Sequence, residues 1–232
     1  MTMDVPLPQS PRIQRVRDYA RMPWKNGAGW TSEIARWPAG ETWDWRLSVA
    51  DVDADAPFSA FPGVERALVL LSGNGIRLRF NGGRSHELAP PHGCLRFAGE
   101  AEVAGELIEG PTRDFNLMWR RDACDAQLWQ RPLVGTVALF VDPEETWVLH
   151  LISGHARFTN DTALGELGAG DTAILPGQAT RQRFVLDGQG SALLIRIARR
   201  GNDAPAPTRS LGPRPCTDAV LPDQKPVDAR AG

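Results

Sequence analysis

Two polar side chains occupy one face of a short predicted strand. In the segment 43–50 (WDWRLSVA), strand alternation puts Trp and aliphatic side chains on one face and Arg46 and Ser48 on the other. The planar guanidinium of an arginine donates two parallel hydrogen bonds to a carboxylate, which a solvated surface arginine does not need. The pattern predicts that Arg46 and Ser48 line a pocket for an anion, with an exposed strand face as the alternative.

A second segment, 114–121 (DFNLMWRR), shows the same alternation. It places Asn116 and Met118 on one face, together with Asp114. An amide offers both a donor and an acceptor, as a ligand with a carboxylate and an N–H group requires. The alternative for Asp114 and Asn116 is backbone capping at the end of a strand.

Further candidates for the same pocket come from two other places. Arg66 opens a predicted strand, where it supplies a second positive charge or pairs with Glu33 or Asp114, and the sequence does not choose between these. Phe58 lies in a loop bounded by proline and glycine that is expected to roof the pocket mouth, with simple loop packing as the alternative.

The loop around Lys25 and Asn26 is polar and rich in glycine. Glycines 27 and 29 leave backbone N–H groups open to an anionic or carbonyl-bearing ligand, and Trp24 is placed to wall the pocket. The alternative is a tight turn between strands with an exposed lysine.

Catalytic and metal-binding patterns are missing from the sequence. No His-x-His pair with a following glutamate occurs, and His150 stands alone in an apolar segment, where a core histidine is expected. His86, His92 and Cys94 lack a recognised zinc spacing. There is no Gly-x-Ser-x-Gly elbow and no phosphate-binding glycine loop. The sequence therefore predicts no catalytic residue, no metal and no cofactor.

The composition excludes several classes of partner. The formal net charge is −2, from 26 basic and 28 acidic side chains, which disfavours nucleic acid. No apolar run approaches the roughly 20 residues of a membrane span, so we expect a cytoplasmic protein with no membrane partner. The three cysteines show no paired short spacing and are expected to be reduced thiols.

The elements that must position these residues are short strands. Apolar segments of strand length alternate with turn formers throughout, which indicates an all-β class with little helix. The segment 67–73 (ALVLLSG) is repeated at 148–154 (VLHLISG), which favours two tandem jelly-roll β-barrels. We predict one barrel over residues 12–122, with the ligand site, and a supporting barrel over 123–200. Residues 201–232, poor in large apolar side chains and rich in proline and alanine, are predicted to be a disordered tail.

The segment 22–34 (MPWKNGAGWTSEI) resembles the signature of the HutD/Ves family, a Trp-x-Asn-Gly-x-Gly-x-Thr core followed by Glu. The resemblance continues through residues 43–52, 57–66 and 114–121. It implies a bicupin fold, which agrees with the internal repeat. The middle residue of the glycine loop is Ala28 here, so we expect Gly27 and Gly29 to carry the unusual dihedral angles.

The resemblance also implies a connection with histidine utilisation, with urocanate, formylglutamate or a related intermediate as ligand. The leading hypothesis is a non-catalytic protein that binds a small carboxylate. The predicted ligand-binding residues are Trp24, Lys25, Asn26, Thr31, Glu33, Arg46, Ser48, Phe58, Arg66, Asn116 and Met118.

Two other classes of function stay open. One is a cupin enzyme that uses His150, His155 and an acidic partner for a metal, or Glu33 as a metal-free general base. The other is a homodimerising scaffold without a ligand.

Overall fold

A computed structural model of the chain describes residues 10–160 and 163–201. These residues form an almost entirely β structure, in which the single helical element is the 3₁₀ turn η1 (Val16–Asp18). The described part of the chain contains no helix that is long and apolar enough to cross a membrane. Except for Gly201, the predicted disordered tail lies outside the described residues.

The first large sheet carries most of the predicted site. Its six strands are antiparallel and lie in the order β2 (Ala20–Pro23), β3 (Gly29–Trp37), β4 (Trp45–Val52), β11 (Thr112–Arg120), β6 (Val64–Ser72) and β9 (Cys94–Ala98). A smaller sheet follows the order β5 (Ala56–Pro57), β10 (Val103–Leu107), β7 (Ile76–Phe80) and β8 (Ser85–Leu88). An apolar cluster that includes Val52, Leu68 and Leu78 joins the two sheets.

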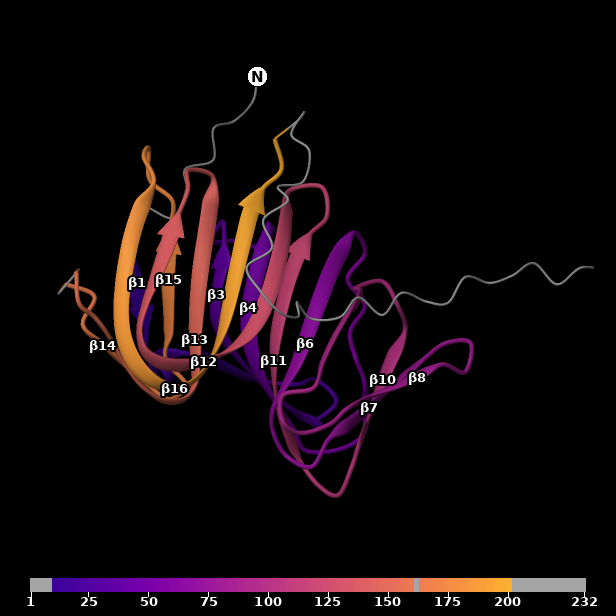
Figure 1. The fold of residues 1–232 in the computed structure, drawn as a ribbon. Helices are drawn as coiled ribbons and strands as arrows, with labels where there is room; N and C mark the ends of the chain where they lie inside the picture. Colours follow the sequence, from indigo (N-terminus) through magenta and orange to yellow (C-terminus); the bar gives the residue numbers. More distant parts are fainter. Residues whose placement is uncertain (1–9, 161–162, 202–232) are drawn as a thin grey trace, which may run out of the picture.

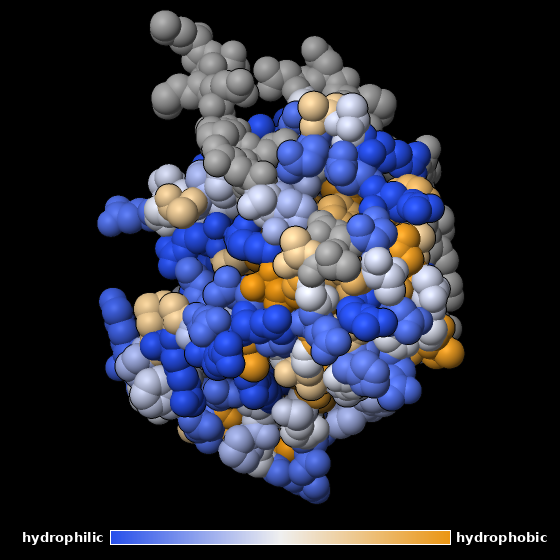
Figure 2. Space-filling view, turned by 90° about the vertical axis from the view of Figure 1, so that its left-hand side faces the viewer, coloured by the Kyte–Doolittle hydropathy of each residue, from blue (hydrophilic) through white to orange (hydrophobic). Residues whose placement is uncertain are grey.

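The second large sheet is formed mainly by the second half of the chain. Its path is β1 (Arg12–Gln14), β15 (Thr172–Pro176), β13 (Glu145–Phe158), β16 (Gln182–Arg199) and β12 (Cys124–Val141), with β14 (Glu166–Gly168) paired to β13. In Figure 1 the strands of this sheet other than the indigo β1 form the curved orange and salmon layer, and β7, β8 and β10 form the separate lobe on the other side. Figure 2 looks at the face that lies on the left in Figure 1. This face is largely hydrophilic, with apolar residues gathered near its centre.

One core joins the two large sheets. Trp45, Leu47 and Val49 of β4 pack in the same buried cluster as Leu193 and Ile195 of β16. Alternation therefore placed the apolar face of β4 correctly, and its other face is turned away from this core. The fold is cupin-like, as predicted, but its sheets are open and do not close into barrels.

The start of the described chain joins the second sheet. Strand β1 pairs with β15, with Arg12 opposite Ile174, although the predicted boundaries assign residues 12–14 to the first unit. The predicted boundary at residue 122 falls in the turn between β11 and β12. Those boundaries remain predictions. Of the cysteines, Cys124 is free and buried, but Cys94 is disulfide-bonded, so the expectation of reduced thiols is wrong for Cys94.

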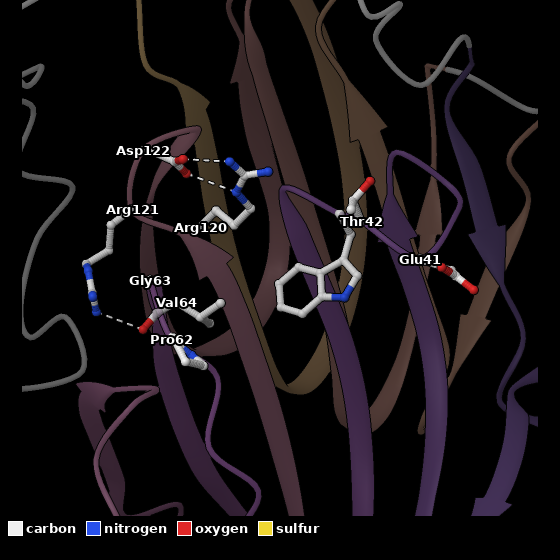
Figure 3. Close-up of a pocket in the computed structure, with 9 residues that line it drawn as sticks. Glu41, Thr42, Pro62, Gly63, Val64, Arg120, Arg121 and Asp122 are labelled. Carbon is white, nitrogen blue, oxygen red and sulfur yellow. Dashed lines mark hydrogen bonds and ion pairs between the residues drawn. The ribbon is translucent and has the colours of Figure 1, made fainter.

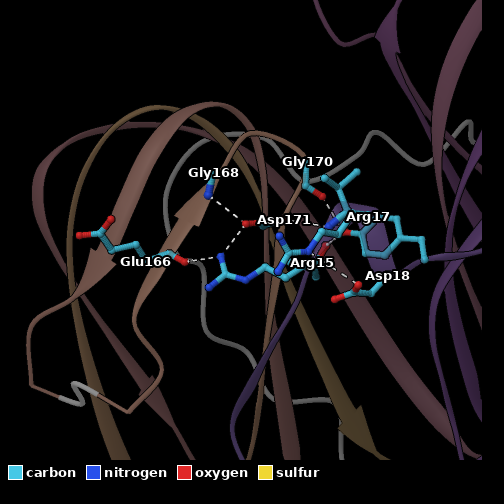
Figure 4. A network of polar contacts seen from close by, with 10 residues as sticks. Arg15, Arg17, Asp18, Glu166, Gly168, Gly170 and Asp171 are labelled. Carbon is cyan, nitrogen blue, oxygen red and sulfur yellow. Dashed lines mark hydrogen bonds and ion pairs between the residues drawn. The ribbon is translucent and has the colours of Figure 1, made fainter.

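Asp171 holds the N-terminal segment in place (Figure 4). Its carboxylate accepts hydrogen bonds from the backbone N–H of Val16 at 2.9 Å, the backbone N–H of Gly168 at 3.0 Å and the guanidinium of Arg15 at 2.8 Å. Burial opposes ionisation of Asp171, but these hydrogen bonds outweigh it and lower the pKa of the carboxyl group.

We expect Asp171→Asn to lower the free energy of unfolding by about 2 kcal/mol at neutral pH, because charge-assisted hydrogen bonds are lost. Because the pKa of Asp171 is lower in the folded chain than in the unfolded one, its stabilisation is complete above about pH 4 and is lost as the pH falls further. Urea unfolding should therefore show the two proteins converging in acid. Asp18→Asn, which changes an exposed carboxylate near Arg17, is the control and should have little effect at either pH. A difference that persists unchanged in acid would contradict this account.

Candidate functional site

A cavity of about 670 Å³ lies on the face of the first sheet that is turned away from the shared core. It is lined by strands β2, β3, β4, β5, β6 and β11, by the loop before β3 and by the loop after β5. Ten of the eleven predicted ligand-binding residues line it, and the exception is Glu33. The lining residues are Met22, Pro23, Trp24, Lys25, Asn26, Thr31, Arg46, Ser48, Ala50, Val52, Pro57, Phe58, Ser59, Phe61, Arg66, Leu68, Asp114, Asn116 and Met118.

The register of three strands brings the polar residues together. Met118 of β11 lies opposite Arg46 of β4 on one side and Arg66 of β6 on the other. One step along β11, Asn116 lies between Ser48 and Leu68. Strand parity predicted the face, and the antiparallel register makes these residues neighbours.

Arg46 is already paired within the protein. Its Nε donates to Oε2 of Glu33 at 2.7 Å, and Arg36 donates to both oxygens of the same carboxylate at 2.6 and 2.7 Å. Burial opposes ionisation of Glu33, but the hydrogen bonds from Arg36 and Arg46 outweigh it and lower the pKa of the carboxyl group. Glu33 thus orients Arg46 and does not itself line the cavity.

Arg36 was missed by sequence reasoning because of a bulge. Strand β3 shifts register between Glu33 and Ala35, so residues 33 and 36 lie on the same side of the sheet instead of on opposite sides. Nothing in the local alternation signals this shift, since Ile34 and Ala35 are both apolar and both pack against the shared core.

Arg66 has no anionic partner among the described residues. The residue is only 6% exposed, its Nη1 donates to the carbonyl of Ser59 at 3.3 Å, and its Nε has no hydrogen-bond partner. Burial, and then the charge of Arg46, lower the pKa of Arg66 to about 10. Neither of the pairings considered from the sequence, with Glu33 or with Asp114, is formed.

Aromatic rings surround this guanidinium. Its central carbon lies 5.0, 5.5 and 5.8 Å from the ring centroids of Phe97, Phe58 and Phe61. The rings provide a cation–π environment but no hydrogen-bond acceptor. Phe58 also packs edge-on against Trp24, so the predicted roof and wall of the pocket touch each other.

Two acceptor oxygens on β11 also lack partners. Oδ1 of Asp114 and Oδ1 of Asn116 are buried and unbonded, while Oδ2 of Asp114 accepts a hydrogen bond from Thr112 at 3.1 Å. Burial raises the pKa of Asp114 to about 7, with a further rise from the charge of Asp51 and an opposing effect of Thr112. Among the described residues, five buried side-chain atoms have no partner, and three of them belong to residues that line this cavity.

The glycine loop is held by internal hydrogen bonds. The indole N–H of Trp24 donates to Oγ1 of Thr31 at 2.8 Å, and the backbone N–H of Ala28 donates to Oδ1 of Asn26 at 3.1 Å. Gly27 has φ +72°, as expected, but Gly29 does not have a positive φ. Gly29 is instead required by close packing, because a Cβ there would lie 2.3 Å from the carbonyl oxygen of Asp51. Ala28 is accommodated without a positive φ.

Comparison with known proteins identifies the group to which this chain is related. The family model HutD matches residues 16–194. An uncharacterized 21.2 kDa protein in the hutC 3' region of Pseudomonas putida is 36% identical over 194 residues, which cover 82% of this chain and 98% of that protein. The chain belongs to the HutD family.

Other members support this assignment to the HutD family. The structure of HutD from Pseudomonas fluorescens SBW25 (formate condition) superposes with a TM-score of 0.72 at 31% identity, covering 83% of this chain and all of that one. The protein Ves of Cronobacter sakazakii is 41% identical over 115 residues, 48% of this chain and 63% of Ves. The resemblance to the HutD/Ves family is therefore confirmed.

Neither His150 nor His155, in the second half of this HutD-family chain, belongs to a metal-binding cluster of described residues. His150 is 2% exposed, its Nδ1 lies 2.9 Å from Oγ1 of Thr172, and its ring lies 4.9 Å from that of Phe115. His155 lies in an exposed part of β13. Within residues 10–160 and 163–201, no group of three or more His, Cys, Asp or Glu residues is arranged to hold a metal ion.

A second hollow of about 620 Å³ lies at the turns beside Trp43 and Gly63 (Figure 3). Three of its four charged side chains are already paired: Arg120 donates to both oxygens of Asp122, and Arg121 donates to the carbonyl of Val64 and to the carboxylate of Glu100. None of the unpartnered buried atoms found in the described residues lies there. The first cavity is therefore the better candidate in this HutD-family protein.

Proposed function

We propose that this HutD-family protein is a non-catalytic binding protein for a small carboxylate, and that its occupancy modulates histidine utilisation. The observation that supports this proposal is Arg66. A buried guanidinium without an anion has an uncompensated desolvation cost, which a ligand carboxylate would offset through charge-assisted hydrogen bonds.

The surroundings of Arg66 suit such a ligand. The cavity volume of about 670 Å³ lies within the roughly 300–1,000 Å³ range of small-molecule pockets. Arg46 shares the carboxylate of Glu33 with Arg36, whereas Arg66 has no carboxylate partner among the described residues, so the attraction for an anion is centred on Arg66, with Lys25 contributing at the rim. Ser48 and Asn116 add hydrogen-bonding groups beside it.

The proposed ligand is an intermediate of histidine degradation. Family membership supports this choice, as does the name of the Pseudomonas putida relative, which places that protein in a hutC region. Urocanate and formylglutamate both carry the carboxylate that Arg66 requires.

Isothermal titration calorimetry tests the proposal directly. We expect at least one of formate, urocanate and formylglutamate to bind at millimolar concentration or below. Binding should be lost in Arg66→Met and unchanged in Arg79→Met, which removes an exposed arginine paired with Glu106 on the smaller sheet. If wild type binds none of these acids at millimolar concentration, or if Arg66→Met binds them as wild type does, the proposed function is wrong.

A further inference from the structure

The cavity has two chemically different ends along strand β11. Arg66 marks one end, opposite Met118. Asp114 lies four residues from Met118 on β11, about 14 Å along a strand at ~3.4 Å per residue. Asn116 lies between them and also lines the cavity. The Arg66 end supplies donors, whereas the Asp114 end supplies acceptors.

The Asp114 end is built into the sheet. Asp114 is fully buried and Asn116 is 9% exposed. Asp114 lies between two apolar residues, Ala50 on β4 and Leu70 on β6, so neither neighbouring strand neutralises its carboxyl group. Among the described residues, the only side-chain hydrogen bond to it comes from Thr112, which donates to Oδ2 and leaves Oδ1 without a partner.

Few charged groups face Asp114. Lys25 lines the same cavity from the glycine loop, and Asp51 is carried by β4. Asp51 itself is held by Arg21 at 3.4 Å and by Arg113 at 3.6 Å. Asp114 is therefore a buried carboxyl group whose ionised form has no cationic partner among residues 10–160 and 163–201.

Unpartnered oxygens accept hydrogen bonds, so their natural partners are donors. We propose that Asp114 and Asn116 form a second subsite, which receives an ammonium, N–H or O–H group of a ligand whose carboxylate binds Arg66. This inference rests on the proposed function and narrows it. The favoured ligand class is a short acid that carries a donor at its far end, and plain monocarboxylates are disfavoured.

A positively charged donor also couples binding to protonation. Near pH 7, where Asp114 is partly protonated, an ammonium group favours the ionised carboxylate and displaces its proton. The preference for an amine should therefore be largest above pH 7 and should decrease as Asp114 becomes neutral in mild acid.

The test compares straight-chain monocarboxylates of four to six carbons with their ω-amino counterparts by calorimetry. We expect the best ω-amino acid to bind wild type about tenfold more tightly than the matching plain acid at about pH 8.5, and the ratio to fall severalfold at about pH 5.5. Asp114→Asn, which keeps the size of the side chain, should reduce the ratio to near one and remove its pH dependence. Asp53→Asn, which removes an exposed carboxylate after β4, should leave the ratio unchanged.

The outcomes separate this inference from the proposed function. If both kinds of acid bind wild type equally, and neither binds Arg66→Met, the proposed subsite at Asp114 and Asn116 is wrong and the carboxylate site at Arg66 stands. If the amine preference survives in Asp114→Asn and does not change with pH, Asp114 is not the acceptor and the inference is also overturned. If no acid binds wild type, both proposals fail. The pH series on wild type decides the matter even if Asp114→Asn does not fold.

Discussion

Replacing Arg66 with methionine is expected to increase the stability of the ligand-free protein while it abolishes carboxylate binding. Arg66 is 6% exposed and has no anionic partner in the described chain, so folding removes its charge from water without compensation. Methionine has a similar length and packs well among the rings of Phe58, Phe61 and Phe97. Replacing even a buried ion pair by apolar side chains of similar volume is often neutral or stabilising by about 1–4 kcal/mol, and for the unpaired charge of Arg66 we expect about 1–2 kcal/mol.

Urea unfolding of the ligand-free proteins measures this change. Arg66→Lys retains the buried charge and should show no gain in stability, and Arg79→Met, on the surface, should change it by less than about 0.5 kcal/mol. A clear loss of stability in Arg66→Met would mean that the aromatic contacts and the bond to Ser59 outweigh desolvation. Arg66 would then be explained by stability alone, without a ligand.

The second large effect is expected at the glycine loop. In Gly29→Ala the new Cβ would lie 2.3 Å from the carbonyl oxygen of Asp51, and the obstacle is backbone of the paired strand β4, which cannot rotate away. Strand β3 must therefore move from β4, at a cost of about 3 kcal/mol in the free energy of unfolding. Because β3 begins at Gly29 and the loop before it carries Trp24, Lys25 and Asn26, ligand binding should weaken as well.

Gly27→Ala is the matched control for this prediction. Gly27 has φ +72°, but a Cβ there would meet nothing within 4 Å, so the expected cost is only about 1 kcal/mol of backbone strain. Thermal or urea unfolding of the two variants gives the comparison. If the two variants lose the same free energy of unfolding, the close approach of β4 is not the reason that position 29 needs glycine.

The sequence predicted the strands and their two faces well. In β4, alternation assigned Trp45, Leu47 and Val49 to the core and Arg46 and Ser48 to the opposite face, and both assignments match the structure. It could not show that the sheets stay open, because closure depends on which edge strands pair and not on the pattern within any strand. The role of Gly29 was missed for a similar reason, since its neighbour on β4 is more than 20 residues away in sequence.

The sequence by itself determined the all-β class, the repeat, the family resemblance and the face of each strand that carries polar residues. These are properties of consecutive residues, because the direction of a side chain in a strand is set by parity. Only the tertiary structure decided which arginine is free. A bulge in β3 brings Arg36 to Glu33, and Glu33 in turn holds Arg46, while Arg66 is buried with no anionic partner in the part of the chain that the structure describes. Charge pairing depends on register, bulges and burial, which combine residues far apart in the chain, so sequence analysis named Arg46 as the leading candidate and could not show that Arg66 is the one of the two without a carboxylate partner among the described residues.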